Sequence, residues 1–142
     1  MIDLCTLGTG GTMPLPDRAL ASLYVRVGGR AVLVDCGEGT QIGIQRLSWG
    51  IQCIDAILLT HYHADHCSGL PGMLLAITKA GRTAPLHIYG PIGLERIVSG
   101  LRVIAPSLSC PIVLHEIIDD YSPFAAIGLT ITPFPLRHEM PC

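Results

Sequence analysis

The chain has 142 residues, of which 49% are hydrophobic and 14% charged, and its formal net charge at pH 7 is −2. Soluble domains carry about 25% charged residues, so this composition argues against a disordered chain, a coiled coil and a basic tail that grips nucleic acid over a broad surface. No run of about 18 uninterrupted apolar residues exists, and Asp3 stands where a signal peptide would be basic, so we expect one soluble cytoplasmic domain.

The first third of the chain reads as strands followed by a helix. Residues Ile2–Gly8 predict a strand that runs into a glycine-rich loop, for which a tight turn is a better account than a phosphate-binding loop. Two β-rich runs, 22–27 and 31–35, flank a Gly-Gly turn and predict an antiparallel hairpin. Thr40 is the expected N-cap of a helix that continues through Trp49.

The rest of the chain alternates strands and helices. A nearly continuous apolar run at 54–59 indicates a strand buried on both faces. The expected elements that follow are a helix at 68–79, a strand at 86–89, a helix at 94–105, and strands at 112–118 and 129–136. This order predicts an α/β layered fold with a mixed sheet.

Six cysteines occur without a C-x-x-C pair. Reducing cytosol disfavours disulfides, and thiolate zinc sites use closer spacings, so we expect thiols that are buried as small apolar residues.

The segment His61-Tyr62-His63-Ala64-Asp65-His66 directly follows the buried strand. In an extended backbone the side chains at i and i+2 point the same way, so His61 and His63 can converge on one ion. Asp65 and His66 lie where the chain turns into the next helix and can face a second ion nearby. Imidazole and carboxylate ligands suit zinc, which predicts a hydrolytic metal site. We expect His87 and His115 to be structural or exposed instead.

The H-x-H-x-D-H motif after a buried strand resembles the metallo-β-lactamase superfamily, whose fold is an αββα sandwich with metals at one edge of the sheets. Five further stretches resemble the ribonuclease Z family of endonucleases, which trim the 3′ trailer of precursor tRNA. They are Leu7–Gly10, Asp35-Cys-Gly-Glu-Gly-Thr-Gln41, Gly69-Leu-Pro-Gly72, Tyr89–Leu94 and Leu136–Cys142. The resemblance covers the chain from end to end.

This resemblance implies that His61, His63 and His138 hold one zinc and that Asp65 and His66 contribute to a second. It further implies a homodimer that hydrolyses an RNA phosphodiester with metal-bound hydroxide, in which Asp65 orients or deprotonates the attacking water. From the residues alone, His138 is supported only by its place after an apolar strand, and an exposed strand-end histidine is an equal reading.

Two more residues acquire roles through the resemblance. Asp35 corresponds to a carboxylate that orients a ligand histidine, and a plain turn residue is the alternative. Arg18 lies in a loop that contacts the tRNA acceptor end in the family, and a solvated arginine is the alternative. Pro16 and Ala19 stand where the family has lysine and asparagine, which weakens the tRNA assignment.

Five ligands are too few for two zinc sites, and the resemblance assigns the others to a later half of the fold. We therefore expect the chain to be the N-terminal part of a single metallo-β-lactamase-like domain. By itself it should be inactive and should self-associate through the apolar surface that would pack against the other half of the fold. Two alternatives remain open: another hydrolase of this fold acting on a small phosphodiester or thioester, and a truncated or assembly-forming chain that binds metal without catalysis.

Overall fold

Six strands form one mixed sheet in the computed structural model, which describes residues 1–142. The strands lie in chain order, and they are β1 (Ile2–Gly8), β2 (Ser22–Val27), β3 (Arg30–Val34), β4 (Ile54–Leu58), β5 (Leu86–Pro91) and β6 (Ile112–Ile117). The pairs β1–β2 and β2–β3 are antiparallel, whereas β3–β4, β4–β5 and β5–β6 are parallel. The predicted α/β class and mixed sheet are confirmed.

The predicted hairpin is present between β2 and β3. Gly28 and Gly29 form its turn with φ angles of 56° and 82°. A two-residue turn of this kind needs positive φ at both positions, which glycine adopts without steric cost.

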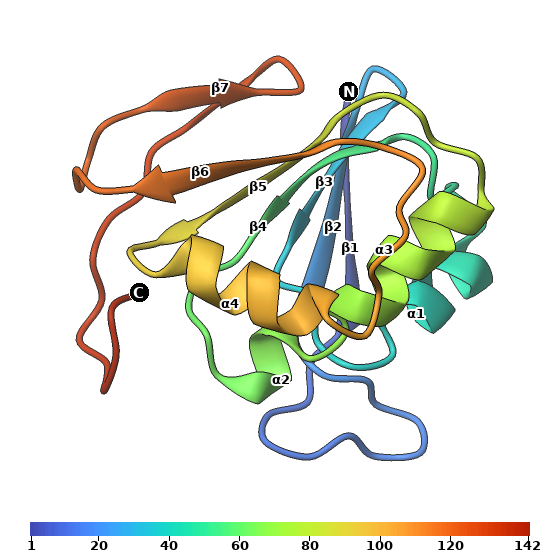
Figure 1. Ribbon diagram of the computed structural model, residues 1–142, viewed down its shortest axis with the longest axis horizontal. Helices are drawn as coiled ribbons and strands as arrows, with labels where there is room; N and C mark the ends of the chain where they lie inside the picture. Colours follow the sequence, from blue (N-terminus) through green and yellow to red (C-terminus); the bar gives the residue numbers. More distant parts are fainter.

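Helices α1 (Thr40–Leu47), α3 (Leu70–Lys79) and α4 (Leu94–Arg102) gather on one side of the sheet, with the short helix α2 (Ala64–Cys67) near one end of it (Figure 1). The main core lies between them and the sheet. Tyr24, Leu33, Ile57 and Ile88 are paired neighbours across four strands, and each is 0% exposed. None of the helices combines the length and apolar character needed to span a membrane.

The helix boundaries differ from the predicted ones at several ends. Gly39, not Thr40, is the N-cap of α1, because Thr40 is already the first helical residue. The φ of Gly39 is 91°, which suits glycine, and the Thr40 hydroxyl donates to the Gly37 carbonyl at 2.7 Å. The helix α1 ends at Leu47, and α4 ends at Arg102 rather than at 105. The predicted helix at 68–79 begins only at Leu70, since the separate helix α2 precedes it.

All six cysteines are free thiols, and three of them, Cys36, Cys67 and Cys110, are buried. The expectation of apolar thiols therefore holds for these three, and burial raises the pKa of the Cys36 thiol to about 12.

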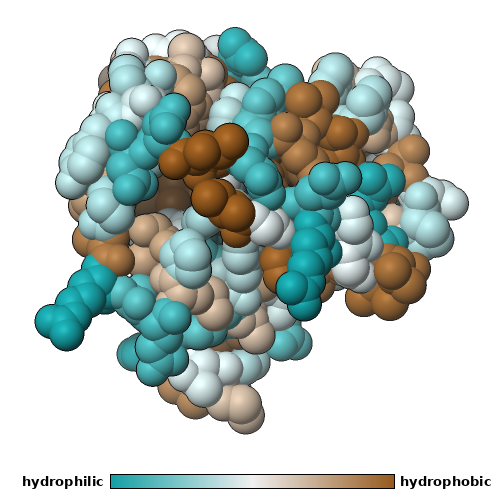
Figure 2. All heavy atoms as spheres, turned by 60° about the vertical axis from the view of Figure 1, so that its left-hand side comes forward, coloured by the Kyte–Doolittle hydropathy of each residue, from teal (hydrophilic) through white to brown (hydrophobic).

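The other face of the sheet is covered only in part. The hairpin of β7 (Phe124–Ala126) and β8 (Leu129–Ile131) packs Ala126 and Ile127 against Val32 and Ala56. Beyond this small cluster the face is open, and Leu4 on β1 is 64% exposed. Figure 2, which turns the side of β6 and the C-terminal segment forward, shows hydrophobic surface interrupted by hydrophilic side chains.

The predicted strand at 129–136 is wrong over most of its length. Only Leu129–Ile131 is extended and paired, and its partner β7 was not predicted. Pro133 and Pro135 have no backbone N–H to donate to a neighbouring strand, so the strand cannot continue through them. The residues that follow β8 form an irregular segment up to Cys142.

Arg82, in the loop after α3, bonds to residues at or just before the start of β4 and β5. Its side chain is 6% exposed and donates to the carbonyls of Ala84 at 2.9 Å, Gln52 at 2.8 Å and Pro85 at 2.7 Å. It also pairs with Asp55 Oδ1 at 2.9 Å. Removing a buried charge with this many partners takes a donor away from four partly buried acceptors.

We predict that Arg82→Met lowers the free energy of unfolding by about 2–4 kcal/mol, because the three carbonyls lose this donor and Asp55 keeps only its pair with Arg30. Urea denaturation followed by circular dichroism measures this change. Arg96→Met is the matched control, since Arg96 is exposed on α4 and has no ion-pair partner. Equal stability of the two variants would show that the Arg82 contacts contribute nothing.

Candidate metal centre

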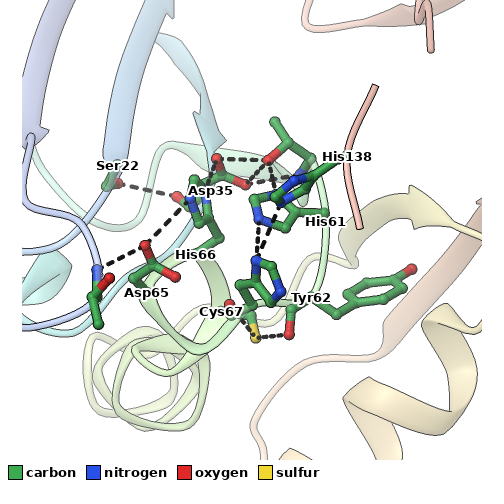
Figure 3. Close-up of polar contacts among 11 residues, drawn as sticks. Ser22, Asp35, His61, Tyr62, Asp65, His66, Cys67 and His138 are labelled. Carbon is green, nitrogen blue, oxygen red and sulfur yellow. Dashed lines mark hydrogen bonds and ion pairs between the residues drawn. The ribbon is translucent and has the colours of Figure 1, made fainter. Parts of the chain in front are cut away.

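The predicted site residues follow two neighbouring parallel strands. Asp35 comes directly after β3, and the segment from Thr60 to His66 follows β4. Because parallel strands end at the same edge of a sheet, these residues meet there. The C-terminal segment also passes this edge and adds His138 (Figure 3).

Three histidines converge at this edge. The distance from His61 Nε2 to His63 Nδ1 is 3.2 Å, and that from His138 Nε2 to His63 Nδ1 is also 3.2 Å. One nitrogen from each ring lies within 4.8 Å of the others, a separation suited to one tetrahedral ion. His63 has an extended backbone (φ −65°, ψ 148°), and Tyr62 points away, with its hydroxyl donating to the Pro91 carbonyl.

His61 is mostly neutral at pH 7. Burial of the ring, together with the nearby His66 and His138, lowers the pKa of the His61 imidazole from its usual 6.5. A neutral ring keeps one nitrogen lone pair free, and metal ligation requires this form. The donor set therefore fits a transition-metal ion.

Asp65 and His66 lie on the short helix α2 beside these rings. His66 Nε2 is 3.6 Å from Asp65 Oδ2, and the His66 ring centroid is 4.1 Å from that of His61. The backbone N–H of Thr12 donates to Asp65 Oδ2 at 3.0 Å and lowers the pKa of that carboxyl. The glycine-rich loop after β1 thus fixes Asp65 in its ionised form, a contact that sequence patterns did not indicate.

Asp35 is a buried carboxylate at the centre of this edge. Its Oδ2 accepts from His66 Nδ1 at 2.7 Å, and its Oδ1 accepts from the Thr60 backbone N–H at 2.8 Å. Its backbone has a φ of 62°, a left-handed conformation that is uncommon outside glycine. The structure thus places Asp35 against a histidine of the motif rather than in an isolated turn.

His138 reaches the other histidines by a different route from the one expected. The prediction that it ends an apolar strand is wrong, because β8 stops at Ile131 and His138 lies in the irregular segment beyond it. That segment folds back, with the Leu136 N–H donating to the Cys142 carbonyl at 3.3 Å. Its course depends on tertiary contacts, which hydrophobic spacing does not report.

Arg18 lies outside the metal cluster, in an exposed loop. The backbone groups of Leu15 and Arg18 bond to each other in both directions at 3.0 Å, which makes a narrow turn. This loop and α1 line a cavity of about 300 Å³ whose wall includes Arg18 and Arg46. The wall also contains Asp17 and Glu38, so both signs of charge are present.

His87 and His115 lie outside the three-histidine cluster. They project from β5 and β6 on the face opposite the helices, and His87 Nδ1 lies 2.9 Å from His115 Nε2. The ring of Tyr89 stacks on His115 with centroids 4.3 Å apart. They form a packed pair and do not join the three-histidine cluster.

Comparison with known proteins finds relatives that are named ribonuclease Z. A ribonuclease Z of Clostridium kluyveri is 50% identical over the whole chain, and one of Lachnoclostridium phytofermentans is 47% identical. The chain spans about half the length of these curated relatives, 47% in both cases. The crystal structure of human tRNase Z, short form, superposes with a TM-score of 0.83 at 29% identity, covering 99% of this chain and 62% of that one.

The family profile described as the metallo-beta-lactamase superfamily matches residues 16–137. This stretch contains the strand-end histidine motif, Asp35 and most of the sheet. The mixed sheet with helices on one face and the histidine cluster at the ends of its strands agree with that match and suggest metal binding. The chain belongs to the metallo-β-lactamase superfamily.

Proposed function

We propose that this chain is the N-terminal half of a zinc-dependent endoribonuclease that removes the 3′ trailer of precursor tRNA. The observation that carries the proposal is the convergence of His61, His63 and His138 beside Asp65 and His66. Its support from comparison is the 50% identity to a ribonuclease Z across the whole chain.

The half-domain proposal rests on three observations. The relatives are about twice as long, since the chain spans 47% of them. Five candidate ligands are too few to complete two zinc sites. One face of the sheet also carries exposed apolar residues, such as Ile2 at 56% and Leu4 at 64%. In the complete protein the remaining half supplies a second layer over this face and the missing ligands.

We assign the ligands as follows. His61, His63 and His138 hold one zinc, and Asp65 and His66 contribute to a second. Zinc at this edge supplies a Lewis acid for hydrolysis of a phosphodiester. The Asp65 carboxylate, held ionised by the Thr12 N–H, orients the attacking water and accepts its proton.

Asp35 orients His66 by accepting from its Nδ1. Arg18 binds a phosphate of the RNA from the loop that lines the cavity with α1. We further propose that the complete enzyme is a homodimer that acts in the cytoplasm, on the ground of its resemblance to the ribonuclease Z family.

Zinc binding is predicted to depend on the three-histidine cluster. His63→Ala removes the nitrogen that lies nearest to both other rings, so we expect the zinc affinity of the complete protein to fall on the order of 100-fold. Competition with a chelating dye measures this affinity. His87→Ala is the matched control and should bind zinc as the unaltered protein does. The isolated 142-residue chain should hold fewer than two zinc ions, and two per chain would contradict the incomplete site.

Substrate choice tests the proposed activity. The complete protein is expected to cleave a precursor tRNA at its 3′ side, and Asp65→Asn should lower kcat about 100-fold or more, because a carboxamide is a poor base. The isolated chain should cleave nothing. Turnover of a small phosphodiester or thioester without cleavage of precursor tRNA would favour the other hydrolase, as the Pro16 and Ala19 replacements suggest. Zinc binding without any turnover would favour a metal-binding chain that is not an enzyme.

Arg18 is predicted to contribute to binding of the RNA substrate but not to hydrolysis of a small phosphodiester. Arg18→Ala should lower kcat/KM for precursor tRNA on the order of 10-fold and reduce the salt dependence of binding, because one phosphate contact is lost. Turnover of a small phosphodiester should not change, since it does not reach the loop. Arg96→Ala, at an exposed position of helix α4, is the control. Equal losses on both substrates would mean that Arg18 supports the fold rather than the RNA.

A further inference from the structure

The hydroxyl of Thr60 lies between Asp35 and the first histidine of the motif. Its Oγ1 is 3.0 Å from Asp35 Oδ1, 2.9 Å from Asp35 Oδ2 and 3.0 Å from His61 Nδ1. The backbone N–H of Thr60 also donates to Asp35 Oδ1 at 2.8 Å. Thr60 is therefore held at both its backbone and its side chain, within hydrogen-bonding distance of Asp35 and His61.

The direction of these hydrogen bonds follows from counting protons. An ionised carboxylate only accepts hydrogen bonds, and a hydroxyl has a single proton to donate. The Thr60 proton is needed between its oxygen and the Asp35 carboxylate, because two bare oxygens at 2.9 Å would repel each other. The Thr60 oxygen then presents a lone pair to His61 Nδ1, and that nitrogen must carry the ring's proton.

The consequence is a defined tautomer of His61. With the proton on Nδ1, the Nε2 lone pair is free, and Nε2 is the atom that lies 3.2 Å from His63 Nδ1 in the cluster. A free imidazole interconverts between its two tautomers, so an environment that selects one removes a competing form that cannot bind metal through this atom.

We infer that Thr60 is a positioning residue that transmits the charge of Asp35 to His61 and fixes its metal-binding tautomer. Asp35 acts on His66 directly, through the 2.7 Å contact to Nδ1, so one buried carboxylate orients histidines of both proposed zinc positions. The inference rests on the proposed metal centre but is independent of the substrate.

Two substitutions separate the hydroxyl from the rest of the side chain. Thr60→Val keeps the shape and removes the hydrogen bonds, and we expect the zinc affinity of the complete protein to fall 10- to 100-fold. Thr60→Ser keeps the hydroxyl and should stay within about threefold of the unaltered protein. Thr83→Val is the control, because Thr83 is exposed and its side chain makes no hydrogen bond. Loss of affinity in the serine variant equal to that in the valine variant, or no loss in either, overturns the inference.

The tautomer itself gives a second measurement that needs no activity. Nitrogen-15 spectra of histidine-labelled, metal-free protein at pH 8 should show His61 protonated on Nδ1, and Thr60→Val should shift the ring toward the Nε2-protonated form. An Nε2-protonated His61 in the unaltered protein overturns the inference, even if the valine variant fails to fold. Failure of the proposed function has a different signature: no zinc binding or no RNA cleavage, with the tautomer still as expected.

Discussion

The buried carboxylate of Asp35 is the interaction on which the organisation of this edge of the sheet depends. It accepts from Thr60 and His66, and the adjacent backbone bonds to the same region, since the Cys36 N–H donates to the His66 carbonyl at 2.8 Å. The backbones around Gly37 and Gly69 approach so closely that a Cβ on Gly69 would lie 2.1 Å from the Gly37 carbonyl oxygen. A left-handed φ at Asp35 costs about 1–3 kcal/mol, which these bonds offset.

Features set by neighbours in the sequence were predictable. The turn at Gly28 and Gly29 follows from two residues that tolerate positive φ between β-rich runs. The convergence of His61 and His63 follows from the two-residue period of an extended chain. The mixed sheet follows from a hairpin succeeded by alternating strands and helices. Each of these depends on a span of a few residues or on the order of the elements.

Features that depend on contacts between distant parts of the chain could not be predicted from the sequence. The segment 129–136 has enough apolar residues to suggest a long strand, but a strand needs a partner, and only Leu129–Ile131 finds one in β7. His138 joins the cluster through a fold-back of irregular chain. The bond from the Thr12 N–H to Asp65 spans 53 positions, and the link from Asp35 to Thr60 spans 25. No spacing rule reports such pairs, because they depend on which loops the sheet brings together.

The low charge of the chain follows from the two faces of its sheet. One face is buried by helices α1, α3 and α4, and the other carries apolar residues beside His87 and His115 and is covered only where the β7–β8 hairpin lies. The row Leu4, Val25 and Val32 runs from this open part toward the hairpin, as adjacent strand pairs. On the proposed half-domain arrangement, the same missing layer that buries this row also brings the remaining ligands to the strand ends. Completion of the core and completion of the metal centre are then one event, so metal binding and folding of the two halves stabilise each other.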